Sequence, residues 1–401
     1  MKSGWIATDL WKLCAFENGD RGTNYPSRSV RTSEGIPFIN AGHLTEDGLD
    51  YSTMDYIPRE RFDLLGGGKV RLGDILFCLR GSLGKFASVG ELNEGAIASS
   101  LVILRPGQHL LPSFLLLFLE SALCKSMIEQ YGNGAAQPNL SSGSLKQFLI
   151  PLPPLLEQQR IVTLLDEAFD GIATAKAKAE KNLQNARAIF ESHLQSVFDE
   201  AAEIGESVVL TDLATDVTDG DHMPPPKALQ GVPFITIGNI AKDTRTIDFS
   251  DTFMVSRVYF DGLKANKKPQ LGDVLYTVTG SFGVPVLINE SREFCFQRHI
   301  GLVRPKPEVS SEWLYYLLMS PQVFKQANEG ATGTAQKTVS LKVLRGYKVP
   351  KVPLAMQLTT VAKLNSLFEE TQRLEAIYQQ KLTALDELKK SLLHRAFNGD
   401  L

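Results

Sequence analysis

The sequence contains little cysteine, and its cysteines show no pattern of a metal or redox site. The four of them, Cys14, Cys78, Cys124 and Cys295, are scattered along 401 residues without a C-x-x-C pair. This distribution argues against a disulfide framework and against a thiolate metal site. It is typical of a protein that works in a reducing compartment.

Long apolar runs are also missing. The longest one, around L-P-S-F-L-L-L-F-L-E (111–120), is interrupted by Pro112 and closed by Glu120, so it is too short to span a bilayer. The first residues, M-K-S-G-W-I-A-T-D-L-W-K, contain no apolar signal region. The sequence therefore predicts a soluble, cytoplasmic protein with no membrane partner.

There is no excess of basic charge either. Lysine and arginine number 42 against 45 aspartates and glutamates, which gives a formal net charge of -3. A protein that binds nucleic acid alone, through phosphate contacts, is usually basic. If this chain binds DNA, a small basic surface or a partner must therefore supply much of the affinity.

Motifs of catalysis are absent as well. There is no H-E-x-x-H, no G-x-S-x-G and no complete phosphate-binding loop. R-G-S-L-G-K-F (80–86) has the wrong spacing for such a loop and is interpreted as a glycine turn. Asp219, Asp221 and His222 lie close together, but a capping or turn role is favoured over a metal site. The sequence thus predicts a binding protein with no catalytic or metal site.

What the sequence does contain is an internal repeat. Its length predicts two or three domains, and residue i placed over residue i+199 aligns many positions without a gap. L-G-D (72–74) falls on L-G-D (271–273), and R-P (105–106) falls on R-P (304–305). Because chance does not give an ordered series of matches, we interpret the chain as a tandem duplication of one unit of about 200 residues.

Each copy has a globular part followed by a helical part. Short strand-like runs such as D-I-L-F-C-L (74–79) alternate with glycine and serine turns and end in an apolar helix, at about 112–130 and again at 311–328. After a proline segment, about 45 residues without proline predict one long helix on the order of 65 Å. The predicted fold class is α+β, a tandem duplication of a mixed α/β domain followed by a long helix. The predicted globular domains are 1–150 and 205–349, and the predicted long helices lie in 151–204 and 350–401.

The two long helices are predicted to pair as an antiparallel coiled coil. Large residues of the second helix face a mostly alanine stripe of the first, which allows knobs-into-holes packing. The polar residues Asn182, Lys381 and His193 fall on this seam and would fix its register, unless a stutter moves them to the flank. In the first helix the predicted seam is Leu165, Ala168, Ile172, Ala175, Ala179, Asn182, Ala186, Ile189, His193 and Ser196. In the second helix it is Leu364, Leu367, Thr371, Leu374, Tyr378, Lys381, Leu385, Leu388, Leu392 and Arg395.

At the prolines and the long helices the chain resembles a known family. G-A-A-Q-P-N-L-S (134–141) and L-I-P-L-P-P-L-L-E-Q-Q-R-I-V (149–162) are similar to the central conserved region of the DNA-specificity subunit of Type I restriction–modification systems. S-L-L-H-R-A-F-N-G-D-L (391–401) resembles the end of that family's distal conserved region. The second copy has Met356 where the motif has a glutamate, and only Gln357 is retained, which weakens the predicted helix-start contact there.

The resemblance implies that each globular domain is a target recognition domain that reads one half of a split, asymmetric site in double-stranded DNA. The paired helices would be a spacer and a platform for two DNA adenine methyltransferase subunits that carry S-adenosylmethionine. Restriction and translocase subunits that use ATP and Mg would complete the complex, and this chain itself would hold no cofactor. The alternative is a non-catalytic coiled-coil scaffold that binds other proteins rather than DNA.

Candidate DNA contacts are of two kinds. Positions alike in both copies, Ser82 with Ser281 and Gln137 with Gln336, either maintain the fold or contact phosphates and base edges. Among positions that differ, Gln297 and Arg298 are suited to bidentate contacts with adenine and guanine. The further basic candidates near turns are Arg80, Lys85, Lys242 and Arg245, for which a solvated charge is the alternative. Glu157 and Gln158 are predicted to stabilise the first helical turn or to contact a methyltransferase.

Overall fold

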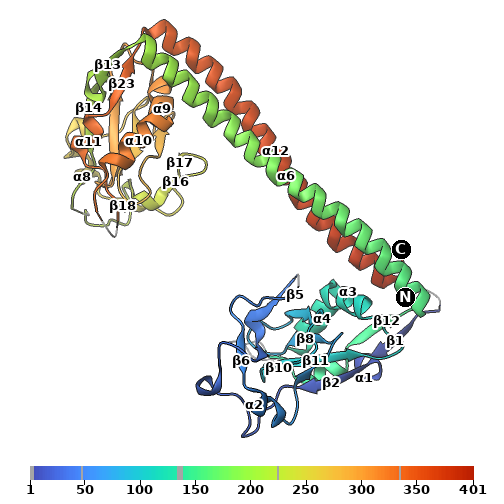
Figure 1. The fold of residues 1–401 in the computed structure, drawn as a ribbon. Helices are drawn as coiled ribbons and strands as arrows, with labels where there is room; N and C mark the ends of the chain where they lie inside the picture. The colour runs from blue at the N-terminus through green and yellow to red at the C-terminus, as the bar shows by residue number, and fades with distance from the viewer. Residues whose placement is uncertain (1–3, 47, 133–138, 224, 334–335) are drawn as a thin grey trace. The chain divides into compact units, whose positions relative to one another are not determined.

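The computed structural model describes residues 4–46, 48–132, 139–223, 225–333 and 336–401 (Figure 1). The chain forms two compact units, which we call unit 1 and unit 2. Unit 1 comprises Met1–Ala179 and Gln380–Leu401, and unit 2 comprises Glu180–Gln379. Each unit therefore contains the globular part of one repeat and a portion of both long helices.

The globular part of unit 1 is built on two four-stranded sheets. The first is antiparallel, whereas the second contains one parallel pair, β3 with β10. A separate ribbon pairs β1 with β12, the strand that leads into the first long helix. The strands are β2 (Cys14–Asn18), β11 (Leu101–Pro106), β8 (Ile75–Cys78) and β9 (Phe86–Ser88); β6 (Asp55–Ile57), β3 (Ile36–Ile39), β10 (Gly95–Ile97) and β7 (Lys69–Val70); β1 (Ile6–Asp9) and β12 (Leu149–Leu152); β4 (Leu44–Thr45) and β5 (Gly48–Leu49). The helices are α1 (Leu10–Leu13), α2 (Arg59–Asp63), α3 (Pro112–Glu120), α4 (Ala122–Tyr131) and α5 (Ser142–Lys146).

Unit 2 repeats this topology except that, among the described residues, its second sheet has three strands and no counterpart of β7. Its antiparallel sheet has the corresponding strand order, and its ribbon pairs β13 with β23 as unit 1 pairs β1 with β12. The predicted α+β class and the tandem duplication are therefore confirmed. The strands are β14 (Ala214–Asp219), β22 (Ile300–Pro305), β19 (Val274–Thr277) and β20 (Pro285–Leu287); β18 (Phe253–Val255), β15 (Val232–Ile235) and β21 (Cys295–Phe296); β13 (Glu206–Val209) and β23 (Lys348–Lys351); β16 (Ile240–Ala241) and β17 (Thr246–Ile247). The helices are α7 (Leu210–Leu213), α8 (Arg257–Asp261), α9 (Ser311–Met319), α10 (Pro321–Gly330) and α11 (Leu341–Arg345).

The two central strands of the antiparallel sheet of unit 1, β8 and β11, are buried on both faces, which is why β8 and the first four residues of β11 are continuous apolar runs. Successive side chains of a strand point to opposite faces. Ile75 and Phe77 belong to a core cluster that includes α3, whereas Leu76 and Cys78 belong to a second cluster on the other face. All four side chains are fully buried. The sheet is thus the middle layer of the unit.

The apolar helix predicted at about 112–130 is two helices, α3 and α4. Ser121 separates them because its backbone is extended, with ψ of 154°. Its hydroxyl donates to the carbonyl of Phe118 at 2.6 Å and accepts from the amide of Cys124 at 3.2 Å. One serine therefore ends the first helix and caps the second. Ser320 separates α9 from α10 in unit 2, where its backbone is also extended and its hydroxyl accepts from the amide of Val323 at 3.4 Å.

The two long helices are α6 (Leu155–Ile204) and α12 (Leu354–Asn398), and they pair antiparallel. In unit 1, Lys176 Nζ lies 2.7 Å from Asp386 Oδ1. In unit 2, Arg187 Nε lies 3.0 Å from Glu375 Oε2. As α6 advances from Lys176 to Arg187, its partner in α12 moves back from Asp386 to Glu375. The predicted antiparallel pairing is therefore confirmed.

The seam of this pair differs from the predicted one at alternate positions. Leu165, Ile172, Leu364 and Thr371 are buried as expected. At the positions between these, the buried residue lies one position later than predicted. The seam residues of each heptad are thus spaced by four residues and then three, whereas the prediction had three and then four. The residues that replace predicted ones are Phe190 for Ile189, Leu194 for His193, Leu382 for Lys381, and Ala396 for Arg395.

This shift has two consequences for the predicted packing. Asn182, Lys381 and His193 are exposed, so of the two alternatives the structure supports the one that places them on the flank, where they do not fix the register. The alanine stripe is found only in part, at Ala179 and Ala186. Of the remaining predicted seam leucines, Leu388 is 45% exposed, so its placement on the seam is wrong. The others are half-buried: Leu367, Leu374, Leu385 and Leu392.

Candidate nucleic-acid interface

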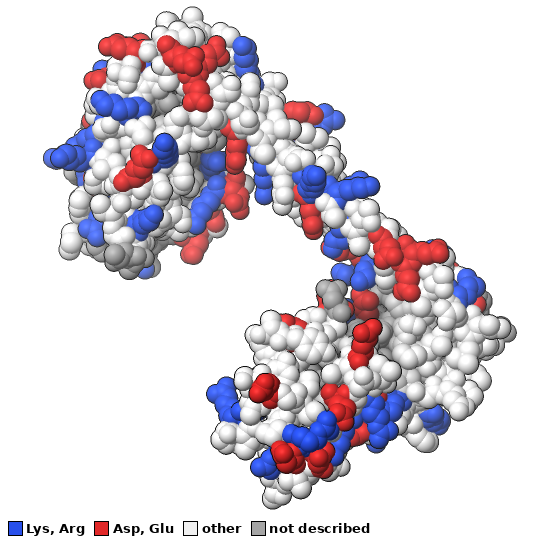
Figure 2. Space-filling model, in the orientation of Figure 1, with Lys and Arg blue, Asp and Glu red and all other residues white. Residues whose placement is uncertain are grey.

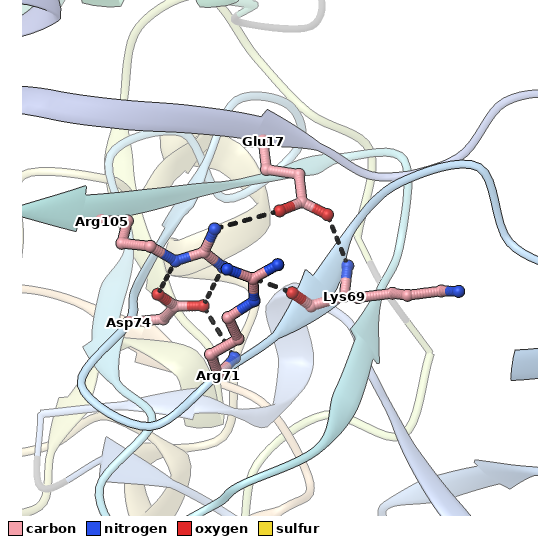
Figure 3. A network of polar contacts seen from close by, with 5 residues as sticks. All are labelled: Glu17, Lys69, Arg71, Asp74 and Arg105. Atoms are coloured by element: carbon pink, nitrogen blue, oxygen red, sulfur yellow. Dashed lines mark hydrogen bonds and ion pairs between the residues drawn. The ribbon is translucent and has the colours of Figure 1, made fainter. Parts of the chain in front are cut away.

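A buried ion pair explains why L-G-D and R-P recur together in both copies. In unit 1 the carboxylate of Asp74 is fully buried and accepts from Arg105 Nε and Nη2, both at 2.7 Å (Figure 3). It also accepts from the amide of Arg71 at 2.8 Å. Arg105 further donates to Glu17 at 3.3 Å, and Glu17 in turn accepts from the amide of Lys69. The pair therefore ties the turn before β8 to β11 and β2.

The same pair is present in unit 2. Asp273 accepts from Arg304 Nε at 2.9 Å and from Nη2 at 2.7 Å, and from the amide of Gln270 at 2.8 Å. Hydrogen bonding to the aspartate raises the pKa of Arg105 and of Arg304 above its ordinary value, since the bond favours the charged guanidinium. In each unit this network, which we call the frame, fixes the turn that precedes β8 or β19 to the neighbouring strand β11 or β22.

A buried glutamine fixes the start of each long helix. Gln158 accepts from the amide of Leu111 and donates to the carbonyls of His109 and Pro153, each at 2.9 Å. Gln357 makes the equivalent three bonds, to Ser310, Glu308 and Val352. All the amide atoms of both side chains thus have backbone partners.

The helix starts differ in the residue before this glutamine. Glu157 accepts from Arg160 Nε at 2.7 Å, and Arg160 Nη2 donates to the carbonyl of Leu401. Met356 stands at the position of Glu157 and packs against the core of unit 2. The substitution therefore removes an ion pair from the second copy, whereas the glutamine contact predicted to weaken there retains its three bonds.

Each unit has a cleft at the same place, beside the end of β8 in unit 1 and the end of β19 in unit 2. We call these the strand-end clefts. Leu79 and Val278, 199 residues apart, line them, as do Asn139 and Thr338 with the same separation. The cleft of unit 1 has a volume of about 370 Å³ and is lined by Asn18, Gly19, Arg21, Leu79, Arg80, Asn139, Leu140, Ser141 and Ser142. That of unit 2 has about 260 Å³ and is lined by Asp219, Val278, Thr279, Arg298, His299, Gly301, Thr338, Val339, Ser340 and Leu341.

The walls of the two clefts are also built alike. Arg80 and Asn139 form an isolated antiparallel β-bridge, and so do Thr279 and Thr338. The amide of Leu140 donates to the carbonyl of Leu79 at 2.9 Å. The equivalent bond in unit 2 measures 2.8 Å. The duplication therefore places one cleft of common architecture on each unit.

The chemistry of the two clefts differs. The unit 1 cleft presents Arg80 and Arg21, of which Arg21 Nη2 donates to the carbonyl of Ser99 at 3.3 Å. The unit 2 cleft presents the exposed Arg298 next to His299, whose pKa is lowered by burial and by the charge of Arg298. A lowered pKa favours the neutral imidazole, which can both donate and accept hydrogen bonds. Asp219, which also lines this cleft, contacts His222 at 3.0 Å.

The remaining predicted DNA contacts lie at other places. Gln297 stands next to the unit 2 cleft, where its amide donates to the carbonyl of Ile235. Ser82 and Ser281 lie in the glycine turns that follow β8 and β19, and Gln336 is exposed beside the second of these turns. Lys85 lies in a separate groove of unit 1, and Lys242 and Arg245 lie on the β16–β17 hairpin. Gln137 is outside the described residues.

Sequence reasoning did not single out Arg21 or His299, both of which line the clefts. It considered Asp219 only for a turn or metal role and not as a residue that lines a cleft. Arg21 and Asp219 lie more than 55 residues before Leu79 and Val278 in the sequence, so no local signal could have assigned them to the clefts. Among the described residues, no group of three histidine, cysteine or acidic side chains is placed to hold a metal ion. In that same part of the chain, no helix is long and apolar enough to cross a membrane.

Comparison with known proteins gives one family. A family model described as "Type I restriction modification DNA specificity domain" matches residues 13–184 and 218–384. The chain is 20% identical over 429 residues to the Type I restriction enzyme EcoKI specificity subunit of Escherichia coli strain K12, covering 100% of this chain and 90% of that protein. It is 23% identical over 430 residues to the StySPI specificity subunit of Salmonella potsdam, with the same coverage.

Solved structures share the fold. One, from work on complex assembly and conformational transition of the type I R-M system, superposes with a TM-score of 0.80 at 20% identity and covers 100% of this chain and 99% of that chain. The HsdS subunit from Thermoanaerobacter tengcongensis superposes with a TM-score of 0.63 at 19% identity, covering 100% and 98%. These likenesses extend over both units.

Proposed function

The chain belongs to the family of Type I restriction–modification DNA specificity domains, and we propose that each of its two units reads one half of a split, asymmetric DNA site. Recognition of DNA sequence within a restriction–modification complex, without catalysis by this chain, is the function that its family membership gives. The proposal adds how that recognition is divided along the chain.

One observation carries this division. The two strand-end clefts share their architecture but not their chemistry, with Arg21 and Arg80 in one and Asp219, Arg298 and His299 in the other. A shared frame supports the same docking on DNA, whereas different donors and acceptors select different bases. Two identical readers would require a symmetric site. Two different readers on one chain require an asymmetric one.

The paired helices α6 and α12 set the spacing between the two half-sites. A base pair more or less between them rotates one half-site about the duplex, so a stiff spacer accepts only one separation. In this proposal the recognition domains are residues 1–150 and 205–349, and the spacer is formed by 151–204 and 350–401.

The partners follow from what this chain lacks. Its net charge is -3, so tight phosphate binding must come from elsewhere. Two DNA adenine methyltransferase subunits, which carry S-adenosylmethionine, clamp the duplex while this chain reads base edges. Restriction and translocase subunits that use ATP and Mg join the same complex. The chain holds no cofactor of its own.

Replacing Arg298 by alanine tests the reading of one half-site. The change is expected to weaken binding of the complete site by about 1–3 kcal/mol, roughly fivefold to 150-fold, and to relax base preference in one half only. The measurement is equilibrium binding by the chain with its methyltransferase to duplexes varied in each half in turn. Unchanged preference in both halves would show that Arg298 does not read bases.

Lys242→Ala is the matched control, because it also removes one positive charge from unit 2 but lies outside the cleft. It is expected to leave base preference unchanged and to weaken binding to all duplexes alike, if at all. Binding of the wild-type complex must also fall as salt rises. A complex with no salt-sensitive DNA binding would favour the scaffold alternative instead.

A further inference from the structure

The two copies differ in the length of the segment that joins β2 to β3 in unit 1 and β14 to β15 in unit 2. In each copy this segment leaves the first strand with the dipeptide Gly-Asp and reaches an isolated β-bridge. Eleven residues separate Asp20 from the bridge residue Thr32, whereas six separate Asp221 from the equivalent Ala228. Unit 1 therefore has five extra residues between two equivalent points. We call residues 21–31 the β2–β3 loop.

The first part of this loop is bound to the segment that follows α2. The carboxylate of Asp20 accepts from the amide of Gly22 at 2.6 Å and from the amide of Gly66 at 2.8 Å. The side-chain amide of Asn24 donates to the carbonyl of Leu64 at 2.9 Å. Because Leu64 and Gly66 are distant from the loop in the sequence, these bonds hold the loop against the body of unit 1.

The two flanks of the loop tip are held on one aromatic ring. Tyr25 packs edge-on against Phe38, with 5.8 Å between the ring centroids, and the next residue, Pro26, is buried. On the other flank, the guanidinium of Arg31 lies over the ring of Phe38 at 4.9 Å and binds Asp55 at 2.6 Å. The residues between these anchors therefore have a fixed position.

The tip of the loop, residues 27–29, is exposed between the anchors. The hydroxyls of Ser27 and Ser29 bond to each other at 2.9 Å, and the backbone forms a short 3₁₀ helix, Arg28–Val30. Within the part of the chain that the structure describes, the guanidinium of Arg28 has no hydrogen bond or ion pair. The tip thus presents a free arginine on a fixed backbone.

Other arginines of this region are already paired. Figure 2 shows basic and acidic residues side by side on the part of unit 1 where Figure 1 places α2. Arg59 of α2 binds Glu94 at 2.5 Å and lies 3.8 Å from Asp63. The guanidinium of Arg59 is therefore occupied by carboxylates, whereas that of Arg28 remains available to a ligand.

The second copy shows that the fold does not need the extra residues. Unit 2 joins the equivalent points with a shorter segment and still places a cation over an aromatic ring directly before its bridge. Lys227 lies over Phe253 at 5.3 Å there, as Arg31 lies over Phe38 in unit 1. Extra residues that the fold does not need, and that many contacts nevertheless hold in place, indicate a role in binding.

We propose that the β2–β3 loop is a base-reading element of unit 1, and that Arg28 binds guanine in the major groove of its half-site. The inference rests on the proposed function and deepens it by naming the base and the residue that reads it. The planar fork of an arginine donates two hydrogen bonds to O6 and N7 of guanine. Such a contact is selective only where the backbone that carries the side chain is held in place.

The position of the loop supports a contact with bases. Gly19 and Arg21, at its start, line the strand-end cleft of unit 1. The loop therefore extends the surface that the proposed function places against base edges. Its length and its free arginine are features of unit 1 alone, as a reader of one half of an asymmetric site requires.

Two variants of Arg28 test the inference in the full-length chain with its methyltransferase. Equilibrium binding is measured at several salt concentrations, on duplexes that carry the methylated site with each base pair varied in turn. Arg28→Ala is expected to weaken binding of the complete site roughly fivefold to 150-fold. It is also expected to remove the preference for one G·C pair, in the half that Arg298→Ala leaves unchanged. Arg28→Lys keeps the charge but not the planar fork, and is expected to lose most of the same preference while binding unrelated duplexes as the wild type does.

Arg59→Ala is the matched control, because it removes an arginine of the same unit whose guanidinium is already paired. It is expected to leave base preference in both halves unchanged. Since Arg28 has no partner among the described residues, Arg28→Ala is expected to unfold in urea as the wild type does. A change in binding would then report on DNA and not on folding.

Three results would overturn the inference. Unchanged binding by Arg28→Ala would show that its charge is only solvated. Equal weakening on all duplexes, with a salt dependence smaller by about one released ion, would assign Arg28 to a phosphate. Lost preference in the half that Arg298→Ala affects would show that the loop does not serve a separate half-site. A wild-type complex without base preference in either half would instead contradict the proposed function itself.

Discussion

Replacing Asp273 by alanine is expected to lower the free energy of unfolding by about 3–5 kcal/mol, because it leaves a partly buried guanidinium without its partner. Asp273 is 2% exposed and accepts from two nitrogens of Arg304 and from the amide of Gln270. Urea unfolding followed by circular dichroism measures the loss. Asp74→Ala, in the equivalent pair of unit 1, is expected to cost a similar amount.

The matched control is Asp261→Ala in the same unit. Asp261 pairs with Arg257 at 3.1 Å, but the two side chains are 57% and 56% exposed. An exposed pair of this kind contributes about 0–1 kcal/mol. Equal losses from Asp261→Ala and Asp273→Ala would contradict the role of the buried pair as the frame of the unit.

The second large effect concerns the seam of the paired helices. Phe190 is 7% exposed and its ring lies 5.2 Å from that of Phe368, whereas the preceding Ile189 is 55% exposed. Phe190→Ala is expected to destabilise the chain by about 3–5 kcal/mol through the cavity that it leaves. Ile189→Ala is expected to change stability by at most about 0.5 kcal/mol, as exposed substitutions do.

Thermal and urea unfolding of the two variants side by side gives the comparison. The heptad assignment made from the sequence alone places Ile189 on the seam and Phe190 beside it. A larger loss from Ile189→Ala than from Phe190→Ala would therefore restore that assignment and contradict the packing described for unit 2.

The duplication and the long helices could be predicted because their signals do not depend on contacts between distant residues. L-G-D and R-P recur at a fixed separation, and the absence of proline from residues 155–204 is visible directly.

The phase of the seam was missed although the sequence carries a signal for it. At three positions the structure turns inward an apolar residue, Leu194, Leu382 or Ala396, that directly follows the polar residue predicted there. Only at 189 and 190 are both neighbours apolar, and there the contact between Phe190 and Phe368 shows which of the two faces α12.

The frame and the clefts were only partly accessible from the sequence. The recurrence of Asp74 and Arg105 indicated that both matter, but not that they bind each other across 31 positions. Arg80 and Arg298 could be proposed from their side-chain type and their place near turns. Their membership of two equivalent clefts depends on how the segments at Asn139 and Thr338 pair with them, which local patterns do not encode.

The central claim, that the two units read separate half-sites, is tested most directly by a methylation map. Methylated adenines are mapped in a host that carries this chain with its methyltransferase, and again after residues 1–150 are replaced by the corresponding domain of another specificity subunit. We predict a split motif that disappears when this chain is deleted and that changes in one half only after the exchange. A change in both halves, or methylation that is unaffected by either alteration, would contradict the account.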